Sequence, residues 1–374
     1  MLPRHAVLNQ PQALEAIAHD TVSLLSLFLS LQNHPDSALL FPGLLPPASM
    51  YVVESHRALK QLDLDAAAVV SDDFAKRVRP SRHRAKLLDD AQKSVDQVAA
   101  DLAEVAERQT RSFMKPHVGF LGPLKRAMQP DLGLSTYDGH VISTTHATAF
   151  NFGVDGNLDD RAFSIGEALG EYTVTLLSMF GLQMPAPVPL TALRGTIQMR
   201  DIKSAWLYRR GPLGKIPTEL AAGMTLLLVG LNYFHHIMEK LLPSGGHTQF
   251  RLKFIVAYHA ASNLRSIQNR LTSSSLLPSA AADVIREVLG NADNRWLRKR
   301  TALRNLLAHY VVDERHAAGL SPDANRAQTI EYFGGKLTYS EMDVLLDRQV
   351  ERMSRALEQG FDLIGDHFWY GQVT

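Results

Sequence analysis

Apolar residues recur every three to four positions along most of the chain, and this spacing predicts a mainly α-helical fold. The alternation that is typical of half-buried strands is scarce. In the first half of the chain, the longest helical pattern covers residues 84–114, with a heptad seam formed by Leu88, Ala91, Val95, Val98, Leu102 and Val105. Such a seam packs either within its own domain or in an intermolecular coiled coil, and the sequence leaves both alternatives open.

Prolines and turn residues predict where these helices end. A helix is expected over residues 14–32, followed by a connector that contains Pro42, Pro46 and Pro47. Short helices are then expected at residues 51–62 and 66–78. Residues 115–160 are the least helical part of the chain, and the pair Asp138-Gly139 beside a β-prone run predicts a small β-hairpin over residues 137–142.

A domain boundary is expected near residues 209–217, where proline and glycine are concentrated and the periodicity on the two sides differs. We therefore predict a mostly helical N-terminal domain, residues 1–210, and a helical C-terminal domain, residues 215–374. The N-terminal domain would sense a trigger, restrain the C-terminal domain or extend a dimer. The sequence does not choose among these roles.

Five helical segments are predicted in the C-terminal domain. The first has Thr218 as its N-cap, and the last opens with the capping-box pair Thr338 and Glu341. Short loops between helices of this length imply antiparallel neighbours in an up-and-down bundle. The expected ranges are residues 219–242, 249–271, 279–289, 295–314 and the segment after residue 338.

The fourth of these helices carries the candidate chemistry. An apolar stripe of Leu303, Leu306, Leu307 and Tyr310 leaves Arg304, Asn305, Ala308 and His309 on the opposite face. An imidazole can take or give a proton near neutral pH, and a guanidinium can hold a phosphate by two parallel hydrogen bonds. A basic run at Arg295, Arg298, Lys299 and Arg300 would attract a polyanion to the same end. These groups suit metal-free cleavage of a phosphodiester by its neighbouring 2′-hydroxyl; the alternative for the helix alone is a solvated polar face.

Composition and charge narrow the classes of protein that remain. Lysine and arginine number 39 against 38 for aspartate and glutamate, so any attraction for nucleic acid must be local. Cysteine is absent, which excludes disulfides, thiolate catalysis and zinc sites that use cysteine. His117, His140 and His146 have no carboxylate at a supporting spacing, so we expect neither a metal nor a cofactor, and a histidine-based metal hydrolase is the weakest alternative.

The two most apolar runs, residues 22–31 and 221–231, are too short or too interrupted to be expected to span a bilayer. The N-terminus lacks the basic-then-apolar order of a signal peptide. We therefore expect a cytoplasmic protein that does not associate with a membrane.

Residues 215–370 resemble the HEPN (higher eukaryotes and prokaryotes nucleotide-binding) superfamily. The shared features are a bundle of four to five helices and an Arg-polar-x3-His motif on a late helix, here Arg304-Asn305-Leu306-Leu307-Ala308-His309. The resemblance covers about two-fifths of the chain. It implies a metal-independent endoribonuclease of toxin–antitoxin or phage-defence type, active as a homodimer whose two motifs line one cleft. It also implies the alternative of a non-catalytic dimerisation or nucleotide- and RNA-binding module.

The resemblance assigns a role to each motif residue. His309 would be the general acid/base, Arg304 would hold the scissile phosphate, and Asn305 would orient the histidine or bind RNA. We expect Arg298, Lys299 and Arg300 to bind the RNA substrate. In family toxins that a partner nucleotidyltransferase silences, the pattern continues His-x-Tyr; here Tyr310 follows His309 directly, so a regulatory partner or antitoxin of that type is in doubt.

Overall fold

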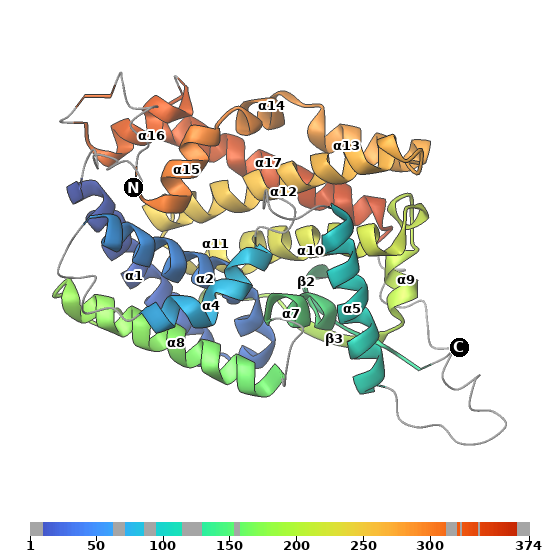
Figure 1. Ribbon diagram of the computed structural model, residues 1–374, viewed down its shortest axis with the longest axis horizontal. Coiled ribbons are helices and arrows are strands. Elements are labelled where there is room, and N and C mark those ends of the chain that lie inside the picture. Colours follow the sequence, from blue (N-terminus) through green and yellow to red (C-terminus); the bar gives the residue numbers. More distant parts are fainter. Residues whose placement is uncertain are drawn as a thin grey trace.

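The N-terminal helices form one layer of the computed structural model (Figure 1). The structure describes residues 10–62, 72–85, 95–113, 129–152, 158–311, 320–321, 324–335 and 337–364. Helix α2 packs against both α1 and α4, and α8 lies across α1 and α4. Their bounds are α1 Gln10–Gln32, α2 Ser37–Gln61, α4 Asp72–Ala85 and α8 Leu158–Met179. The predicted α class is confirmed.

The prediction of a non-helical connector at Pro42, Pro46 and Pro47, followed by a short helix over residues 51–62, is wrong. Pro42, Pro46 and Pro47 lie inside the single helix α2. Each proline removes a backbone donor from the helical ladder. Apolar side chains on both sides of the prolines are buried, among them Leu40 and Leu59, so tertiary packing offsets the loss.

The expected hairpin is confirmed, and it belongs to a small antiparallel sheet in the order β2-β1-β3. Asp138 and Gly139 both have positive φ, 50° and 87°, as a two-residue hairpin turn requires. The third strand lies within residues 191–210, for which the sequence predicted no element. The strands are β1 Leu132–Tyr137, β2 His140–Thr144 and β3 Ile197–Ile202.

Helix α7 (Thr145–Phe152) packs against strands β1 and β2, and helix α5 (Val95–Phe113) contacts both α7 and α10. Val98, Leu102 and Val105 of the heptad seam are buried inside the same chain. The described part of the seam therefore packs intramolecularly, while Leu88 and Ala91 lie outside the described residues. Shorter elements precede the C-terminal helices: a 3₁₀ turn η2 at Leu190–Ala192, α9 at Ser204–Tyr208 and a 3₁₀ turn η3 at Leu213–Lys215.

The C-terminal half contains long helices that run side by side, with shorter ones across their ends (Figure 1). The capping box of Thr338 and Glu341 is formed as predicted. Thr218 is not an N-cap, since Pro217 takes that position without a side-chain hydrogen bond. The elements are α10 Thr218–Tyr233, a π-helical turn η4 Phe234–Met238, α11 Glu239–Leu241, α12 His247–Ser273, α13 Ser279–Leu289, α14 Ala292–Arg298, α15 Thr301–His309, α16 Arg326–Gly334 and α17 Tyr339–Gly360.

The predicted single helix over residues 295–314 is wrong. It is divided at Lys299 and Arg300 into α14 and α15, and α15 ends at His309 because Tyr310 adopts a left-handed backbone with φ 63°. Helix α16 forms between the fourth and fifth predicted segments, where no helix was predicted. The finer description of this half as a HEPN-like up-and-down bundle stays a prediction.

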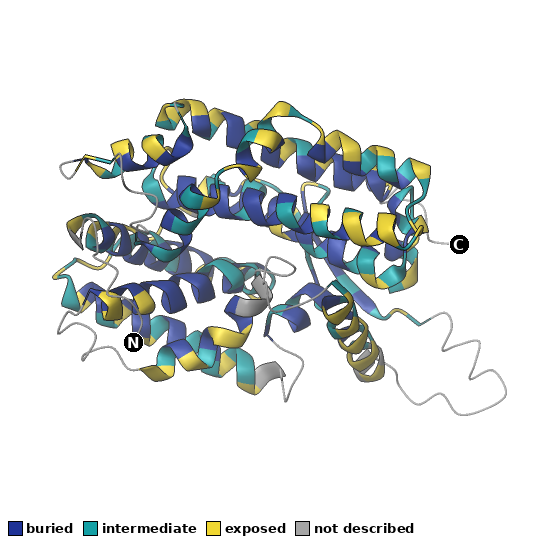
Figure 2. Ribbon diagram, turned by 45° about the horizontal axis from the view of Figure 1, so that its top comes forward, coloured by how far each residue is buried: buried dark blue, intermediate teal, exposed yellow. Residues whose placement is uncertain are grey.

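Buried residues on both sides of residue 210 form one apolar cluster, from Ala13 to Leu363 (Figure 2). Tyr233 of α10 illustrates the contact, because its hydroxyl donates to the carbonyl of Leu40 at 2.6 Å and its ring lies against Gly43. The division into two domains stays a prediction. The apolar core is continuous across the expected boundary.

In the part of the chain that the structure describes, two helices are long and apolar enough, by length and composition, to cross a membrane. They are Pro11–Gln32 and Thr218–Leu241, longer than the apolar runs within them, and 56% and 67% of their most apolar windows are buried in the fold. Core helices of soluble proteins and signal sequences pass the same test.

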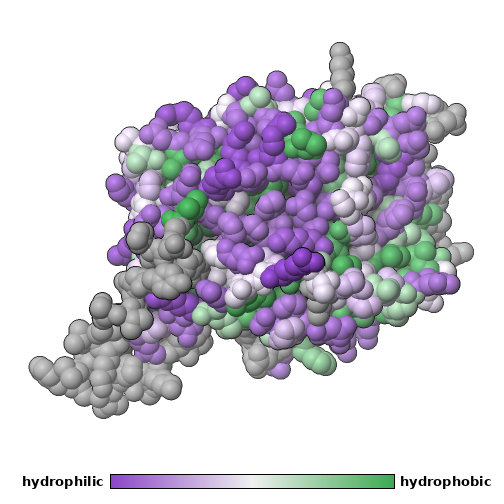
Figure 3. Space-filling view, turned by 180° about the vertical axis from the view of Figure 1, so that it is seen from behind, coloured by the Kyte–Doolittle hydropathy of each residue, from purple (hydrophilic) through white to green (hydrophobic). Residues whose placement is uncertain are grey.

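Figure 3 shows a rear surface that is hydrophilic over its centre, with hydrophobic residues in smaller groups. The cytoplasmic location stays a prediction.

We predict that Gly43→Ala destabilises the protein by about 1–3 kcal/mol, because the added Cβ would lie 2.3 Å from the buried Tyr233 ring. Urea unfolding followed by circular dichroism measures this change. Gly166→Ala in α8 is the matched control, since no atom lies within 4 Å of its added Cβ and alanine favours a helix by about 0.5–1 kcal/mol. Equal effects of the two substitutions would refute the close contact of α2 with α10.

Candidate functional site

Helix α15 is buried on more of its circumference than the sequence indicated. Leu303, Leu306 and Leu307 face the core as predicted, and Ala308, expected on the polar face, is buried as well. The helix packs against α12, α2 and α16. The small side chain of Ala308 allows this approach, so the polar part of the helix is a narrow strip around Arg304, Asn305 and His309.

A buried carboxylate from the N-terminal half holds His309. The imidazole Nδ1 lies 2.7 Å from Oε2 of Glu54, in α2. The Glu54 side chain is only 1% exposed, whereas that of His309 is 25% exposed. The bond orients the ring through Nδ1, so Nε2 is the ring nitrogen that remains for other contacts. This partner was missed because 255 residues separate the two side chains.

Glu54 also binds two arginines. It accepts hydrogen bonds from Arg82 of α4 and, at 3.2 Å, from Arg57 one turn further along α2. Burial alone raises the pKa of Glu54, but the hydrogen bond and charge of His309 and the charges of Arg82 and Arg57 outweigh it and lower the pKa to about 2. The carboxylate therefore stays ionised at neutral pH.

Arg304 and Asn305 are half-buried. The Arg304 guanidinium carbon lies 5.5 Å from the centre of the Tyr258 ring, in α12, which is a cation–π contact. Tyr258 in turn shares a hydrogen bond of 3.1 Å with Thr301 at the start of α15. Among the described residues, no hydrogen bond joins Asn305 to His309. The carboxylate of Glu54 is the group that orients the ring, and the role of Asn305 stays a prediction.

The basic run has two environments. Arg298 and Lys299 are exposed and can meet a polyanion. Arg300 is half-buried, with its guanidinium carbon 5.6 Å from the Trp296 ring. That guanidinium also lies so close to Gly335, after α16, that a Cβ there would be 2.4 Å away. Arg300 therefore packs against its own chain, and RNA binding by the three residues stays a prediction.

Tyr310 anchors the end of α15. Its hydroxyl donates to Asp20 of α1 at 2.6 Å, and Arg251 of α12 lies 2.8 Å from the same carboxylate oxygen. The Arg251 guanidinium also lies 4.4 Å from the Tyr310 ring and donates to the carbonyl of Leu307 at 2.5 Å. Asp20, Arg251 and Tyr310 are all at most 2% exposed. Tyr310 is therefore a structural contact of the motif helix.

A second polar cluster, formed by histidines at the C-terminal end of α10, was not predicted from the sequence. The rings of His140 and His236 stack with centres 4.0 Å apart, and the His235 ring lies 4.8 Å from that of His236. His140 Nδ1 lies 2.9 Å from the buried Glu358, which also accepts a hydrogen bond of 2.8 Å from Asn232. These histidines line a cleft beside α17. The only local signal was the pair His235-His236, since strand β2 and helix α17 supply the other members.

The environments of the two stacked rings differ. The hydrogen bond that His140 donates to the Glu358 carboxylate raises the pKa of His140. Burial, with the charges of His140, His235 and Lys240, lowers the pKa of His236 to about 3. The π-helical turn 234–238, a feature frequent at functional sites, presents His235 and His236 to the cleft.

The structure does not place His117, His140 and His146, the three histidines weighed as metal ligands, at one site. His146 is buried, with Nδ1 2.8 Å from the Tyr208 hydroxyl, and His117 lies outside the described residues. Within the described ranges, no group of three or more histidine, aspartate or glutamate side chains has an arrangement that could hold a metal ion.

Comparison with known proteins gives no match: no family model, no curated protein and no solved structure matches the chain.

We predict that Glu54→Gln destabilises the protein by about 3 kcal/mol at pH 7, because it leaves Arg82 paired with a neutral amide. The folded-state pKa of Glu54 is about 2 against 4.5 unfolded, so its stabilisation is complete above pH 4.5 and disappears as the pH falls to about 2. The wild-type and variant urea midpoints should therefore converge over this range. Glu351→Gln, at an exposed ion pair, should change stability by less than about 0.5 kcal/mol; a constant difference down to pH 2 would contradict the prediction.

We also predict that His140 titrates well above His236 in an NMR titration of the imidazole C–H signals. Glu358→Gln removes the charged acceptor and should lower the pKa of His140, because burial then dominates. Glu351→Gln is the control, since Glu351 lines the same cleft and does not bond to His140. This variant should leave the pKa of His140 as in the wild type. The cluster as described would be refuted by one common pKa for both rings in the wild type.

Proposed function

We propose that the protein is a metal-independent endoribonuclease of HEPN type, with Arg304, Asn305 and His309 at its active site. The observation that carries the proposal is the fixed imidazole: Nδ1 of His309 is bound to an ionised, buried glutamate, and the ring remains one-quarter exposed. A ring held in one orientation with one nitrogen directed outward is suited to proton transfer.

In this reaction His309 Nε2 takes the proton of a ribose 2′-hydroxyl, and that oxygen attacks the adjacent phosphorus. The bond from phosphorus to the 5′ oxygen breaks, and an imidazolium returns a proton to the leaving oxygen. The products are a 2′,3′-cyclic phosphate and a 5′-hydroxyl. The guanidinium of Arg304 stabilises the charge that develops on the non-bridging oxygens, and Asn305 contacts the RNA.

The reaction needs one base and one acid, and each chain supplies a single motif histidine. A homodimer in which two motifs line one cleft provides both groups, which is the arrangement that the resemblance implies. Exposed Arg298 and Lys299 beside the motif would bind the RNA backbone. A cytoplasmic toxin or phage-defence effector, with or without a regulatory partner, is the setting we propose.

The second candidate is a non-catalytic HEPN-like module that dimerises or binds nucleotide or RNA. One observation favours it: Glu54 ties His309 to Arg82 and Arg57, so the motif also joins the N-terminal helices to α15. In such a module the same bonds would serve stability and ligand binding without chemistry.

We expect purified protein to cleave total tRNA or mRNA in EDTA and to leave cyclic phosphate ends. His309→Ala and Arg304→Ala should each lower the rate about 10²–10⁴-fold, because each removes a group that acts in the transition state. His19→Ala and Arg265→Ala are controls at exposed positions away from the motif helix, and should retain the wild-type rate.

Circular dichroism on each variant separates loss of activity from loss of fold. If cleavage persists in both motif variants, the site is wrong. RNA binding and dimerisation without any cleavage would favour the non-catalytic module. Growth arrest on expression, relieved by His309→Ala, identifies a nuclease that needs a cellular trigger.

A further inference from the structure

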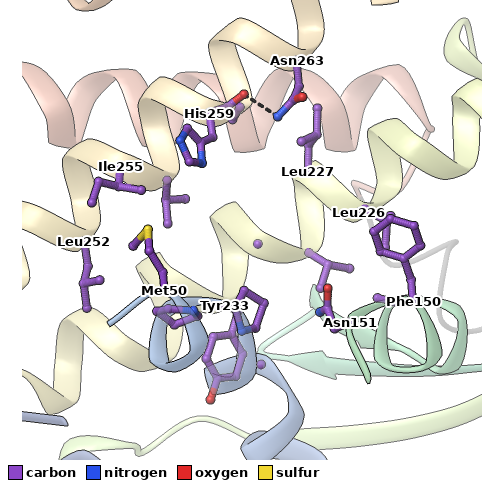
Figure 4. Close-up of a pocket in the computed structure, with 18 residues that line it drawn as sticks. Met50, Phe150, Asn151, Leu226, Leu227, Tyr233, Leu252, Ile255, His259 and Asn263 are labelled. Carbon is purple, nitrogen blue, oxygen red and sulfur yellow. Dashed lines mark hydrogen bonds between the residues drawn. The ribbon is translucent and has the colours of Figure 1, made fainter. Parts of the chain in front are cut away.

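A cavity of about 140 Å³ opens between four helices, α2, α7, α10 and α12. Its wall is mainly apolar, with side chains from all four helices directed around one hollow (Figure 4). The apolar lining includes Met50, Phe150, Leu226, Leu227, Leu252 and Ile255. Water is a poor occupant of such a space, because it finds too few hydrogen-bonding partners there.

The polar side chains of the cavity are few, and none of them carries a permanent charge. Asn263 and His259 lie one turn apart on α12, and the Asn263 amide donates to the His259 carbonyl at 2.7 Å (Figure 4). Asn151 of α7 and Tyr233 of α10 are the other polar side chains of the labelled wall, and the Tyr233 hydroxyl donates to the carbonyl of Leu40. Among the described residues that line the cavity there is no lysine, arginine, aspartate or glutamate. A charged ligand would therefore lose its hydration without a permanently charged side chain to pair with.

Of the lining residues that the structure describes, Gly230 is the one that is exposed, so it marks the side on which the cavity meets solvent. It lies within helix α10, where glycine is less favourable than alanine. A Cβ at this position would meet no atom within 4 Å, and the residue is exposed and borders the cavity. Packing of α10 therefore does not require a glycine here. Any larger side chain would project into the opening.

We propose that this cavity is a binding site for a small uncharged molecule with a single aromatic ring and one hydroxyl group. A dry, apolar cavity of about 150 Å³ accepts one benzene ring, which fixes the size class. The apolar wall takes the ring, and the polar groups of Asn263, His259 and Asn151 offer the hydroxyl its hydrogen bond. This site is separate from the nuclease motif, and its test does not depend on RNA cleavage.

The test uses phenol and benzoate on the full-length wild-type chain. Calorimetric titration and ¹H–¹³C spectra of the methyl groups should show saturable binding of phenol, with shifts at Met50, Leu227 and Ile255. The affinity expected for so small a ligand is roughly millimolar or somewhat tighter. Benzoate has the same ring and a carboxylate, and should bind at least about tenfold more weakly because its charge has no partner. Equal binding of both, or no saturation by phenol, would overturn the proposal.

Gly230→Leu places a side chain at the mouth and should weaken phenol binding at least about tenfold, by steric exclusion. Gly170→Leu is the matched control, since it also lies within a helix, α8, and its added Cβ meets no atom within 4 Å. It should bind phenol as the wild type does. Unchanged binding by Gly230→Leu would assign the phenol to another site. Because the phenol and benzoate comparison needs no variant, failure of either variant to fold leaves the proposal testable.

Discussion

The carboxylates of Asp20 and Glu54 are buried, and both hold the end of helix α15 against the first two helices. Burial of a charge is costly unless it is paired and hydrogen-bonded. Asp20 meets Arg251 and the Tyr310 hydroxyl, and Glu54 meets Arg82 and His309. Removing either carboxylate would leave an arginine unpaired in the interior. The position of the motif therefore depends on residues that come 255 and 290 positions earlier in the chain.

Helix α12 contacts three features on which the proposed functions depend: the C-terminal end of α15, Arg304 and the apolar cavity. Its Arg251 supports the carbonyl of Leu307 in α15, and its Tyr258 lies under Arg304. The neighbouring His259 belongs to the wall of the apolar cavity. A ligand that shifted α12 would therefore act on the surroundings of Arg304 through consecutive residues of one helix. This is a physical connection between the two sites, and coupling would be shown by a change in RNA cleavage on addition of phenol.

Buried ionisable groups are arranged differently in the two polar clusters. Around Glu54, two arginines and a histidine surround one carboxylate, which keeps it ionised. Burial and cationic neighbours lower the pKa of His236, so this ring stays neutral. The carboxylate of Glu358 raises the pKa of its stacked partner, His140, so that ring is protonated more readily. Paired groups with separated pKa values are typical of sites that move protons, but they also occur in structural networks. The motif is preferred for the nuclease because Arg304 and the exposed Arg298 and Lys299 add phosphate-binding groups beside His309.

Local interactions determined the parts of the fold that the sequence predicts well. Helix α13 covers the expected residues 279–289, the turn at Asp138-Gly139 forms, and Thr338 caps α17 through Glu341. Each depends on groups a few residues apart. Tertiary packing decided the rest: it carries α2 through three prolines, turns the backbone at Tyr310 and brings Glu54 to His309. The sequence by itself determined the helical class and the candidate Arg304 and His309. Their orienting partner, the histidine cluster and the apolar cavity depend on contacts between distant segments, which no local pattern of residues specifies.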